Sequence, residues 1–327
     1  MSETKLTLSE RVEWVKDSGR DVVSSISGGK DSTAMALFIQ ENGIDKTNKV
    51  HYVYCDTKWE HPELVDYISN VVEPWLSPNF HRLTNPKFPN GMEDLVKSRG
   101  MFPTRIMRFC TTDLKINPIK SYIRGLKDKG IDPINAVGIR AQESFRRSQM
   151  EEFEPGGPIG CDTWRPLFNY TIDDVVAIHE RHSMKPCSLY YRKDRPVKRV
   201  GCWPCILSDK KTIKDFVEED PGKVELIQGM EKVFIPLAHV KARAAKKKKG
   251  EEYKPDSVAG GTFFNQSQTP HMRPIDEVAK WSKTVRGGKQ YPLFAGKEPF
   301  LPDNPAERGC GMWGLCDVPD EDGEFSP

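Results

Sequence analysis

Short apolar runs alternate with longer mixed stretches over the first part of the chain. The short, β-branched runs predict strands, and the longer stretches predict helices. We expect strands at residues 21–26, 50–55 and 135–139, and helices at 33–40, 63–72 and 171–181. Pro74 is expected to stop the second helix, and residues 171–174 have the pattern of a capping box that opens the third.

Alternating strands and helices predict a doubly wound α/β fold, in which helices cover both faces of a mostly parallel sheet. We assign residues 1–200 to this domain. The composition changes after about residue 200, where a lysine run (Lys246–Lys249) and stretches rich in Gly, Pro, Thr and Ser appear. We therefore expect residues 201–327 to form an irregular, cysteine-bearing and basic region that packs on the first domain or swings over it.

Composition excludes some classes of protein. The 327 residues include 49 basic and 47 acidic side chains, so the formal net charge of +2 favours only local contacts with nucleic acid. The longest apolar run is residues 34–39, far short of the ~20 residues that cross a membrane. The charged N-terminus predicts no secretory signal. Eight cysteines then indicate metal ligands or catalytic thiols in a reducing, cytoplasmic setting.

The hexapeptide Ser-Gly-Gly-Lys-Asp-Ser lies between the first predicted strand and the first predicted helix. Its glycines let the backbone approach a ligand closely, and its N–H groups join a helix N-terminus to form an anion site. The lysine adds a positive charge and the serines add hydroxyl donors. An ordinary Gly-Gly turn is the alternative. The predicted phosphate ligands are Ser27, Gly28, Gly29, Lys30, Asp31 and Ser32.

This hexapeptide resembles the phosphate loop of the PP-loop ATP pyrophosphatases. Further segments resemble, in order, motifs of the phosphoadenosine-phosphosulfate (PAPS) reductase branch of that superfamily. These are the Asp-Thr segment at 56–63, the Arg-x-Cys-Thr segment at 108–118, the Gly-Ile-Arg segment at 138–147, the Trp-x-Pro-Leu segment at 164–175 and the Leu-Tyr and Cys-x-x-Cys segments at 189–205. The matches extend from residue 21 to about residue 210.

The resemblance implies a site at the carboxyl ends of the strands, where open α/β sheets bind ligands. Asp56, Arg140 and Arg146 are expected to bind the nucleotide, because arginine forks suit phosphate or sulfate. Lys30 and Asp31 are the expected catalytic residues, with Asp31 holding Mg²⁺ across the phosphates of ATP. In the family, the lysine-containing loop is usual where ATP itself is split, so Lys30 favours ATP over a sulfonucleotide.

Three cysteines are expected to converge. Cys202 and Cys205 form a tight pair, and the resemblance brings Cys110 to them as ligands of an iron–sulfur cluster, with 4Fe–4S the favoured type. The candidates for the fourth ligand are Cys187, Cys310 and Cys316, and we predict Cys316. Cys110 follows Phe109, whereas cluster-containing reductases carry adjacent cysteines there. The DNA-phosphorothioation sulfurtransferases resemble this chain better. A structural Zn²⁺, a redox dithiol and inert thiols are the alternatives.

Two features of the C-terminal region bear on the reaction. Cys310 lies in a glycine-rich tail that loosely resembles the mobile tail of the reductases, so we expect it to attack or carry sulfur, with a metal-ligand or structural role as the alternative. The lysine run at Lys246–Lys249 is read as a basic block in a loop. It is either a solvated segment or a contact for nucleic-acid phosphates.

The sequence thus predicts an ATP-dependent sulfur-transfer enzyme that splits ATP to AMP and pyrophosphate and adenylates an acceptor, with DNA or tRNA favoured. We also expect a sulfur donor protein, no membrane partner, and a homodimer as one option for the assembly. Three rivals are kept: a PAPS or adenylyl-sulfate reductase, the small subunit of an ATP sulfurylase, and a non-catalytic nucleotide-binding subunit of a modification complex.

Overall fold

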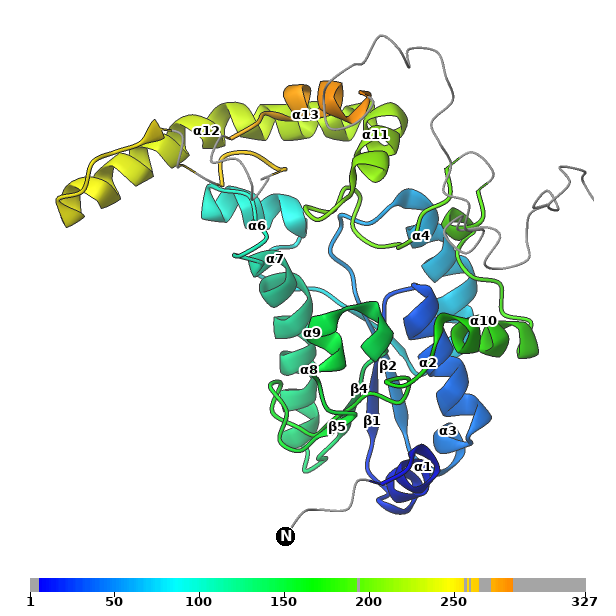
Figure 1. Cartoon of the computed structure of the whole chain (residues 1–327). Coiled ribbons are helices and arrows are strands. Elements are labelled where there is room, and N and C mark those ends of the chain that lie inside the picture. Colours follow the sequence, from blue (N-terminus) through cyan, green and yellow to red (C-terminus); the bar gives the residue numbers. More distant parts are fainter. Residues whose placement is uncertain (1–5, 193–194, 256–257, 259, 265–271, 285–327) are drawn as a thin grey trace, which may run out of the picture.

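The computed structural model describes residues 6–192, 195–255, 258, 260–264 and 272–284. Its centre is a six-stranded sheet in the order β3-β2-β1-β4-β6-β5 (Figure 1). The strands are β1 (Val22–Ile26), β2 (Val50–Cys55), β3 (Phe80–Leu83), β4 (Ile134–Ala136), β5 (Phe153–Glu154) and β6 (Thr163–Trp164). All neighbouring pairs are parallel except β5 with β6, which is antiparallel.

Helices cover both faces of this sheet, as predicted for a doubly wound fold. On β1, Val22 and Ile26 face one hydrophobic cluster and Val23 faces another, because successive side chains of a strand point to opposite faces. The first face is covered by α1 (Leu8–Asp17), α2 (Lys30–Glu41), α3 (Ile44–Thr47), α4 (Pro62–Tyr67) and α10 (Ile172–Arg181). The second face is covered by α8 (Asn117–Lys127).

The third predicted helix begins where its capping box is expected. The Thr171 hydroxyl accepts a hydrogen bond from the Asp174 N–H at 3.2 Å, and the Asp174 carboxylate accepts one from the Thr171 N–H at 2.7 Å. These two bonds satisfy N–H groups that the first turn of a helix leaves unpaired. The expectation for α10 is therefore confirmed.

The expected stop at Pro74 is wrong. The helix continues from α4 through a π-helical turn at Ile68–Val72 into α5 (Glu73–Leu76). In this wider turn the Glu73 N–H donates to the Ile68 carbonyl, and Pro74 follows directly, at the point where the hydrogen-bond pattern changes from π back to α. The strand expected at 135–139 also ends early, because after Ala136 the chain turns and the Ile139 N–H bonds the Val137 carbonyl at 2.9 Å.

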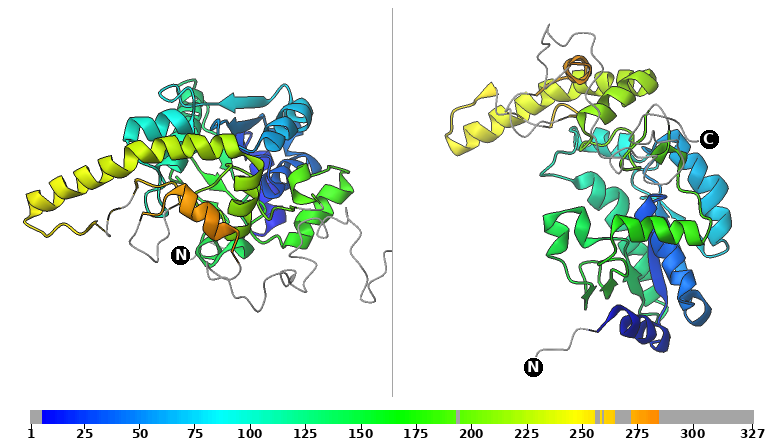
Figure 2. Two further views of the ribbon diagram at one scale, coloured as in Figure 1. Left: turned by 90° about the horizontal axis from the view of Figure 1, so that it is seen from above. Right: turned by 45° about the vertical axis from the view of Figure 1, so that its right-hand side comes forward.

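The region beyond residue 200 is helical, not irregular, over much of its described part. It contains α11 (Lys210–Glu219), α12 (Pro221–Lys249) and α13 (Ile275–Ser282). A third hydrophobic cluster joins these helices to α6 (Met92–Arg99) and to the segment around α7 (Phe109–Thr111). The 29-residue α12 extends beyond the body of the molecule (Figure 2). The sequence analysis placed Lys246–Lys249 in a loop, but these residues form the last turn of α12.

Short elements complete the fold: a π-helical turn at Thr112–Ile116, 3₁₀ turns at Ala141–Glu143 and Ser188–Tyr190, and α9 (Phe145–Ser148). Within the described part of the chain, no helix combines the length and apolar character needed to cross a membrane.

Candidate nucleotide and sulfur site

The phosphate loop connects β1 to α2. Gly28 has φ of +70°, and a Cβ there would lie 2.7 Å from the Ile68 side chain, so both the turn and the packing require glycine. Gly29 is the N-cap of α2 and provides no side-chain hydrogen bond to the first turn of the helix. The Ser32 hydroxyl accepts a bond from the Ser27 N–H at 3.1 Å and holds the loop closed. This loop has the form of an anion site.

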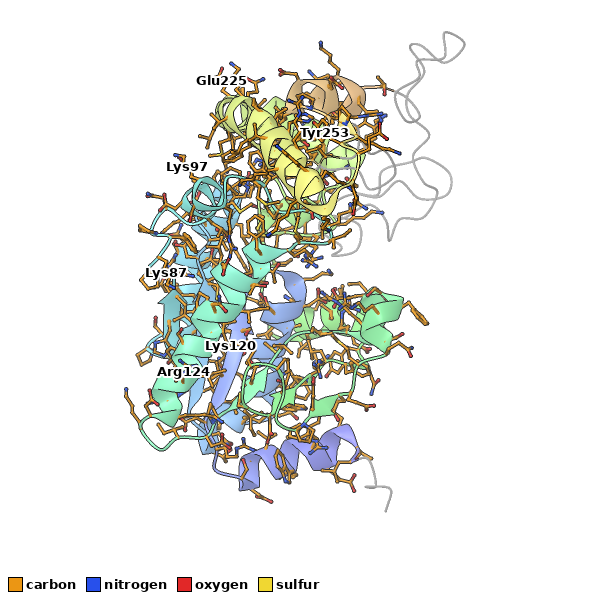
Figure 3. The ribbon with its side chains drawn as sticks, turned by 90° about the vertical axis from the view of Figure 1, so that its left-hand side faces the viewer. Lys87, Lys97, Lys120, Arg124, Glu225 and Tyr253 are labelled. Carbon is orange, nitrogen blue, oxygen red and sulfur yellow. The ribbon has the colours of Figure 1, made fainter. Side chains whose placement is uncertain are left out.

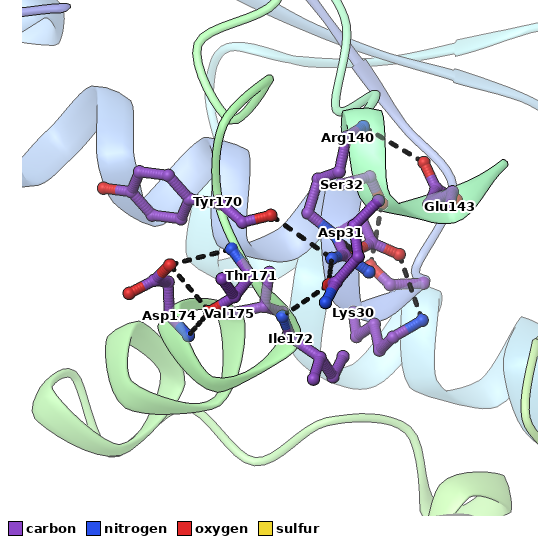
Figure 4. Close-up of polar contacts among 12 residues, drawn as sticks. Lys30, Asp31, Ser32, Arg140, Glu143, Tyr170, Thr171, Ile172, Asp174 and Val175 are labelled. Carbon is purple, nitrogen blue, oxygen red and sulfur yellow. Dashed lines mark hydrogen bonds and ion pairs between the residues drawn. The ribbon is translucent and has the colours of Figure 1, made fainter. Parts of the chain in front are cut away.

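Asp31 lies between two cations at the start of α2. Lys30 Nζ is 3.1 Å from one carboxylate oxygen and Arg140 Nε is 2.6 Å from the other (Figure 4). Burial would raise the pKa of Asp31, but Lys30 and Arg140 together hold it below its ordinary value. The carboxylate is thus charged at neutral pH and fixes both cations beside the phosphate loop.

Arg140 reaches Asp31 because β4 is the parallel neighbour of β1. Its side chain is 5% exposed and also donates to the Gln142 side chain at 2.9 Å. A Cβ at Gly138 would lie 2.8 Å from the Asp31 carbonyl oxygen, so glycine lets the loop after β4 lie directly against α2. The structure therefore brings Lys30, Asp31 and Arg140 together at one end of the sheet.

The other two expected nucleotide ligands, Asp56 and Arg146, lie apart from the Lys30–Asp31–Arg140 cluster. Asp56 follows β2 at the same edge of the sheet, but its carboxylate accepts bonds from the Lys58 N–H at 3.0 Å and from Lys58 Nζ at 2.6 Å. It therefore stabilises a local turn. Arg146 is exposed on α9, beyond the Arg140 turn. Within the described part of the chain, neither residue makes a hydrogen bond or an ion pair with the Lys30–Asp31–Arg140 cluster.

The donor set does not fit an Mg²⁺ ion held by Asp31. Both of its oxygens already accept from cations, so a metal would have to displace Lys30 or Arg140. Such a displacement would leave a buried arginine without its counter-ion, which is costly. We therefore assign Asp31 a positioning role and derive no step through a metal at this residue.

The three predicted cysteines line one cavity. Cys110, Cys202 and Cys205 all face a space of about 270 Å³ between the α7 segment and the chain at 197–209. Burial raises the pKa of Cys202 to about 11, against the opposing effect of the nearby Lys115 ammonium. Burial also raises the pKa of Cys110. Without a bound metal these two thiols are therefore protonated at neutral pH.

The Cys-x-x-Cys segment is pinned to the chain after β2. Cys202 pairs with Glu60 in an isolated antiparallel bridge, and the Trp203 N–H donates to the Trp59 carbonyl at 2.7 Å. The Trp59 indole N–H donates in turn to the Pro204 carbonyl at 3.1 Å. Lys223, in the first turn of α12, donates to the Trp203 carbonyl at 2.9 Å. The cysteine pair is thus held between the sheet domain and α12.

The donor chemistry suits a soft metal or cluster, because three thiols face one space. Within the described residues, however, no three His, Cys, Asp or Glu side chains are gathered closely enough to hold a metal ion. The predicted fourth ligand, Cys316, and the predicted nucleophile, Cys310, lie outside the described residues. Cys187 is fully buried in the cluster on the first sheet face and does not line the cavity.

The cysteine cavity and the phosphate loop are neighbours. Val200 lines the cavity, and its Cγ2 would lie 3.6 Å from a Cβ on Gly29 of the phosphate loop. Tyr190, which is fully buried, accepts a hydrogen bond from the Lys30 N–H at 3.2 Å through its hydroxyl. The segment from Tyr190 to Cys202 therefore connects the anion site to the thiols.

Three residues at this junction have no role in the sequence analysis. Lys115 lies close to Cys202, Glu60 and Cys55. His61 is the N-cap of α4 and lines the cavity. Tyr190 accepts a hydrogen bond from the Lys30 N–H. Each falls inside a segment quoted for the family resemblance. The motifs therefore mark the segments that meet at this junction, but only the three-dimensional packing shows which side chains of those segments face it.

The model of the phosphoadenosine phosphosulfate reductase domain matches residues 21–208. That match covers more than half of the 327 residues. The chain belongs to the phosphoadenosine phosphosulfate reductase domain family. A 37.8 kDa protein from the gpa 5′ region of Escherichia phage 186 is 27% identical over 329 aligned positions, which cover 84% of this chain and 91% of that protein.

Two solved structures are also similar to this member of the family. The PAPS reductase of Candida auris in its phosphate complex is 20% identical, with a TM-score of 0.43, over 62% of this chain and 90% of that one. The U34-tRNA thiolase NcsA of Methanococcus maripaludis, solved with its 4Fe–4S cluster, is 16% identical, with a TM-score of 0.37, over 71% of this chain and 82% of that one.

Proposed function

We propose that this protein is an ATP-dependent sulfur-transfer enzyme, which splits ATP to AMP and pyrophosphate and so adenylates an acceptor before sulfur is inserted. The observation that carries the proposal is the junction of two sites. A phosphate loop with a lysine and a cavity with three cysteines share the wall formed by Val200. Membership of the PAPS reductase domain family supports sulfur-related chemistry.

The first step is a displacement at phosphorus. An acceptor oxygen attacks the α-phosphorus of ATP, the bond to the bridging oxygen of the β-phosphate breaks, and pyrophosphate leaves. Lys30 and the positive end of the α2 helix dipole stabilise the negative charge of the leaving group, while Asp31 and Arg140 fix the geometry. In this scheme the protein contributes positioning and electrostatics, and ATP arrives with its own Mg²⁺.

The second step is substitution at the activated acceptor atom, in which a sulfur nucleophile forms the new bond and AMP leaves. Cys110, Cys202 and Cys205 would hold an iron–sulfur cluster, with Cys316 as the fourth ligand, and such a cluster would supply a binding position for sulfur. Cys310 would receive sulfur from a donor protein as a persulfide, and a thiol reductant would release it as sulfide, which regenerates the Cys310 thiol and oxidises the reductant to a disulfide. Zn²⁺ at the same thiols is the alternative.

We further propose that the acceptor is a nucleic acid, bound in part by Lys246–Lys249. These lysines form the end of α12, which extends beyond the body of the protein. A helix end with several positive charges suits phosphate contacts, since each neutralised phosphate releases counterions.

A second candidate is reduction of a sulfonucleotide, which the matched family model favours. In that reaction, Cys310 would attack the sulfur of PAPS. The two candidates differ in the ligand of the phosphate loop, because a reductase binds PAPS and an ATP-splitting enzyme binds ATP.

Calorimetric titration of the full chain with ATP and, separately, with PAPS distinguishes these candidates. We expect tighter binding of ATP, and a loss of about 10-fold or more in Lys30→Ala, in line with a charge-assisted contact of about 1.5–3 kcal/mol. Lys120→Ala is the matched control, because Lys120 is exposed on the outer side of α8 (Figure 3). Tight binding of PAPS without binding of ATP would select the reductase.

A further inference from the structure

A short turn beside the cysteine cavity is built rigidly but presents apolar side chains to solvent. The turn is Thr104–Met107, in which the Thr104 N–H donates to the Met107 carbonyl at 3.1 Å. The Met107 N–H donates in return to the Thr104 hydroxyl at 3.0 Å. Thr104 is only 7% exposed. Just before the turn, fully buried Phe102 donates its N–H to the Gly260 carbonyl at 2.8 Å. The turn is therefore anchored at its base.

The tip of this turn carries the most exposed large apolar side chain among the described residues. Ile106 is 93% exposed and Met107 is 49% exposed. Single exposed apolar residues are common on protein surfaces. Here, however, two adjacent ones are held out by reciprocal hydrogen bonds and flanked by the exposed Arg105 and Arg108. The tip therefore has the form of an apolar wedge between two cations.

The wedge adjoins the candidate sulfur site. Arg108 lines the cavity that contains Cys110, Cys202 and Cys205. The described lining of that cavity also includes Lys115, Lys198 and Arg199, against one carboxylate, Asp209. The described lining of the cavity thus carries more cations than anions, and a polyanion matches both the wedge and this lining in charge.

We propose that the turn at residues 104–107, with Arg108, binds the acceptor as single-stranded nucleic acid. Ile106 and Met107 pack against the face of an unstacked base, while Arg105 and Arg108 pair with phosphates on either side of it. Such a wedge enters a duplex only by unstacking a base step, whereas an unpaired strand or loop exposes its base faces without that cost, so we take the unpaired form as the ligand. This binding would place the contacted nucleotide at the mouth of the cysteine cavity. The inference rests on the proposed function and locates its acceptor.

Fluorescence anisotropy of a labelled 20-nucleotide single strand, titrated with the full chain, tests the proposal. The double variant Ile106→Ala/Met107→Ala should bind about 10-fold more weakly, because the apolar surface of the two side chains no longer packs against a base. Val233→Ala is the matched control, because Val233 is 61% exposed on α12. Both variants should melt at the wild-type temperature, since both change exposed side chains. Equal single-strand affinity of the double variant and the wild type would overturn the proposal.

Salt dependence gives an independent readout of the arginines. Arg105→Gln should reduce the slope of log affinity against log salt by about 0.7, as expected for one lost contact with a single-strand phosphate. Arg124→Gln is the control, because Arg124 points outward from α8 (Figure 3). The slope should be unchanged in this control. An unchanged slope in Arg105→Gln would remove the phosphate contact from the proposal, and wild-type preference for a duplex of the same sequence would contradict it.

Failure of this inference is distinguishable from failure of the proposed function. The Lys30→Ala variant should retain single-strand binding while losing ATP binding. If ATP is bound but the strand is not, the acceptor assignment is wrong and the nucleotide assignment stands. If the strand binds through Ile106 but ATP does not bind, the turn is a nucleic-acid site on a protein with another activity.

Discussion

Asp31 illustrates how one side chain organises the phosphate site. Its two oxygens accept from Lys30 and Arg140, which come from opposite sides of the loop. Arg140 is buried, and it is held there by a carboxylate from a neighbouring strand–helix unit. The sequence predicts Lys30 and Asp31 in the phosphate loop and Arg140 at a strand end, but not that Asp31 pairs with the other two. Such a contact depends on β4 lying next to β1, which is a property of the sheet order.

Removing the charge of Asp31 should therefore destabilise the fold as well as the site. Asp31→Asn leaves Arg140 buried without its counter-ion, and we expect a loss of about 3 kcal/mol in the free energy of unfolding. Urea denaturation at pH 7 measures this loss. Asp66→Asn is the control, because Asp66 is exposed on α4. Equal denaturation midpoints for the two variants would show that the ion pair contributes nothing to stability.

At the scale of elements, α12 carries a signal that the sequence analysis missed. Its buried residues Val224, Ile227, Glu231, Phe234 and Ala238 recur every three to four positions, as on one face of a helix. The lysine run, with the stretches rich in Gly, Pro, Thr and Ser that follow it, made the region look irregular. By contrast, the strand–loop–helix unit around the phosphate loop was predicted correctly, since its glycines and apolar runs are local features. The pairing of segments that are distant in the sequence is not a local feature, so the sequence did not predict it.

Glu231 couples α12 to the two segments that pack on it. It is 2% exposed and its carboxylate accepts from the Phe263 N–H at 3.0 Å and from the Ile275 N–H at 2.7 Å. Burial raises the pKa of Glu231 to about 7, and these two bonds oppose the shift. The folded protein therefore holds this proton more tightly than the unfolded chain does.

The stability of the folded protein should therefore depend on pH through Glu231. A raised carboxyl pKa contributes stability that is present at low pH and is lost as pH rises from about 4.5 to about 7. The free energy of unfolding of the wild type should therefore fall over this pH window relative to that of E231Q. The variant itself should be less stable than the wild type, because its amide nitrogen cannot accept a hydrogen bond. Melting temperatures of both proteins between pH 4.5 and 8 measure the difference. A constant difference would show that Glu231 does not titrate in this range.

At the scale of the whole molecule, a sheet domain and a helical cluster meet at the cysteine pair. The bridge between Glu60 and Cys202 joins the chain after β2 to the Cys-x-x-Cys segment, and Lys223 ties that segment to α12. The family motifs predicted that Cys110, Cys202 and Cys205 would come together, and all three line one cavity. What fills the cavity depends on chemistry that the sequence pattern leaves open between iron–sulfur and zinc.

Metal content resolves that choice. In protein purified without oxygen, we expect iron and acid-labile sulfide in near-equal amounts, both lost in Cys202→Ser and Cys110→Ser. Cys161→Ser should retain them, because Cys161 is buried in the cluster under α8, away from the cavity. Stoichiometric zinc, or no metal, would exclude the cluster and assign these thiols a structural or redox role.

The central claim is that the phosphate loop splits ATP between its α- and β-phosphates. Its most direct test is to quantify AMP, ADP and pyrophosphate after incubating the full chain with Mg²⁺-ATP, reductant, sulfide and a single-stranded nucleic acid. The account predicts AMP and pyrophosphate in equal amounts, no ADP, and a loss of at least 100-fold in Lys30→Ala but not in Lys120→Ala, consistent with removal of one leaving-group contact. Formation of ADP, or AMP formation that is unaffected by Lys30→Ala, would contradict it.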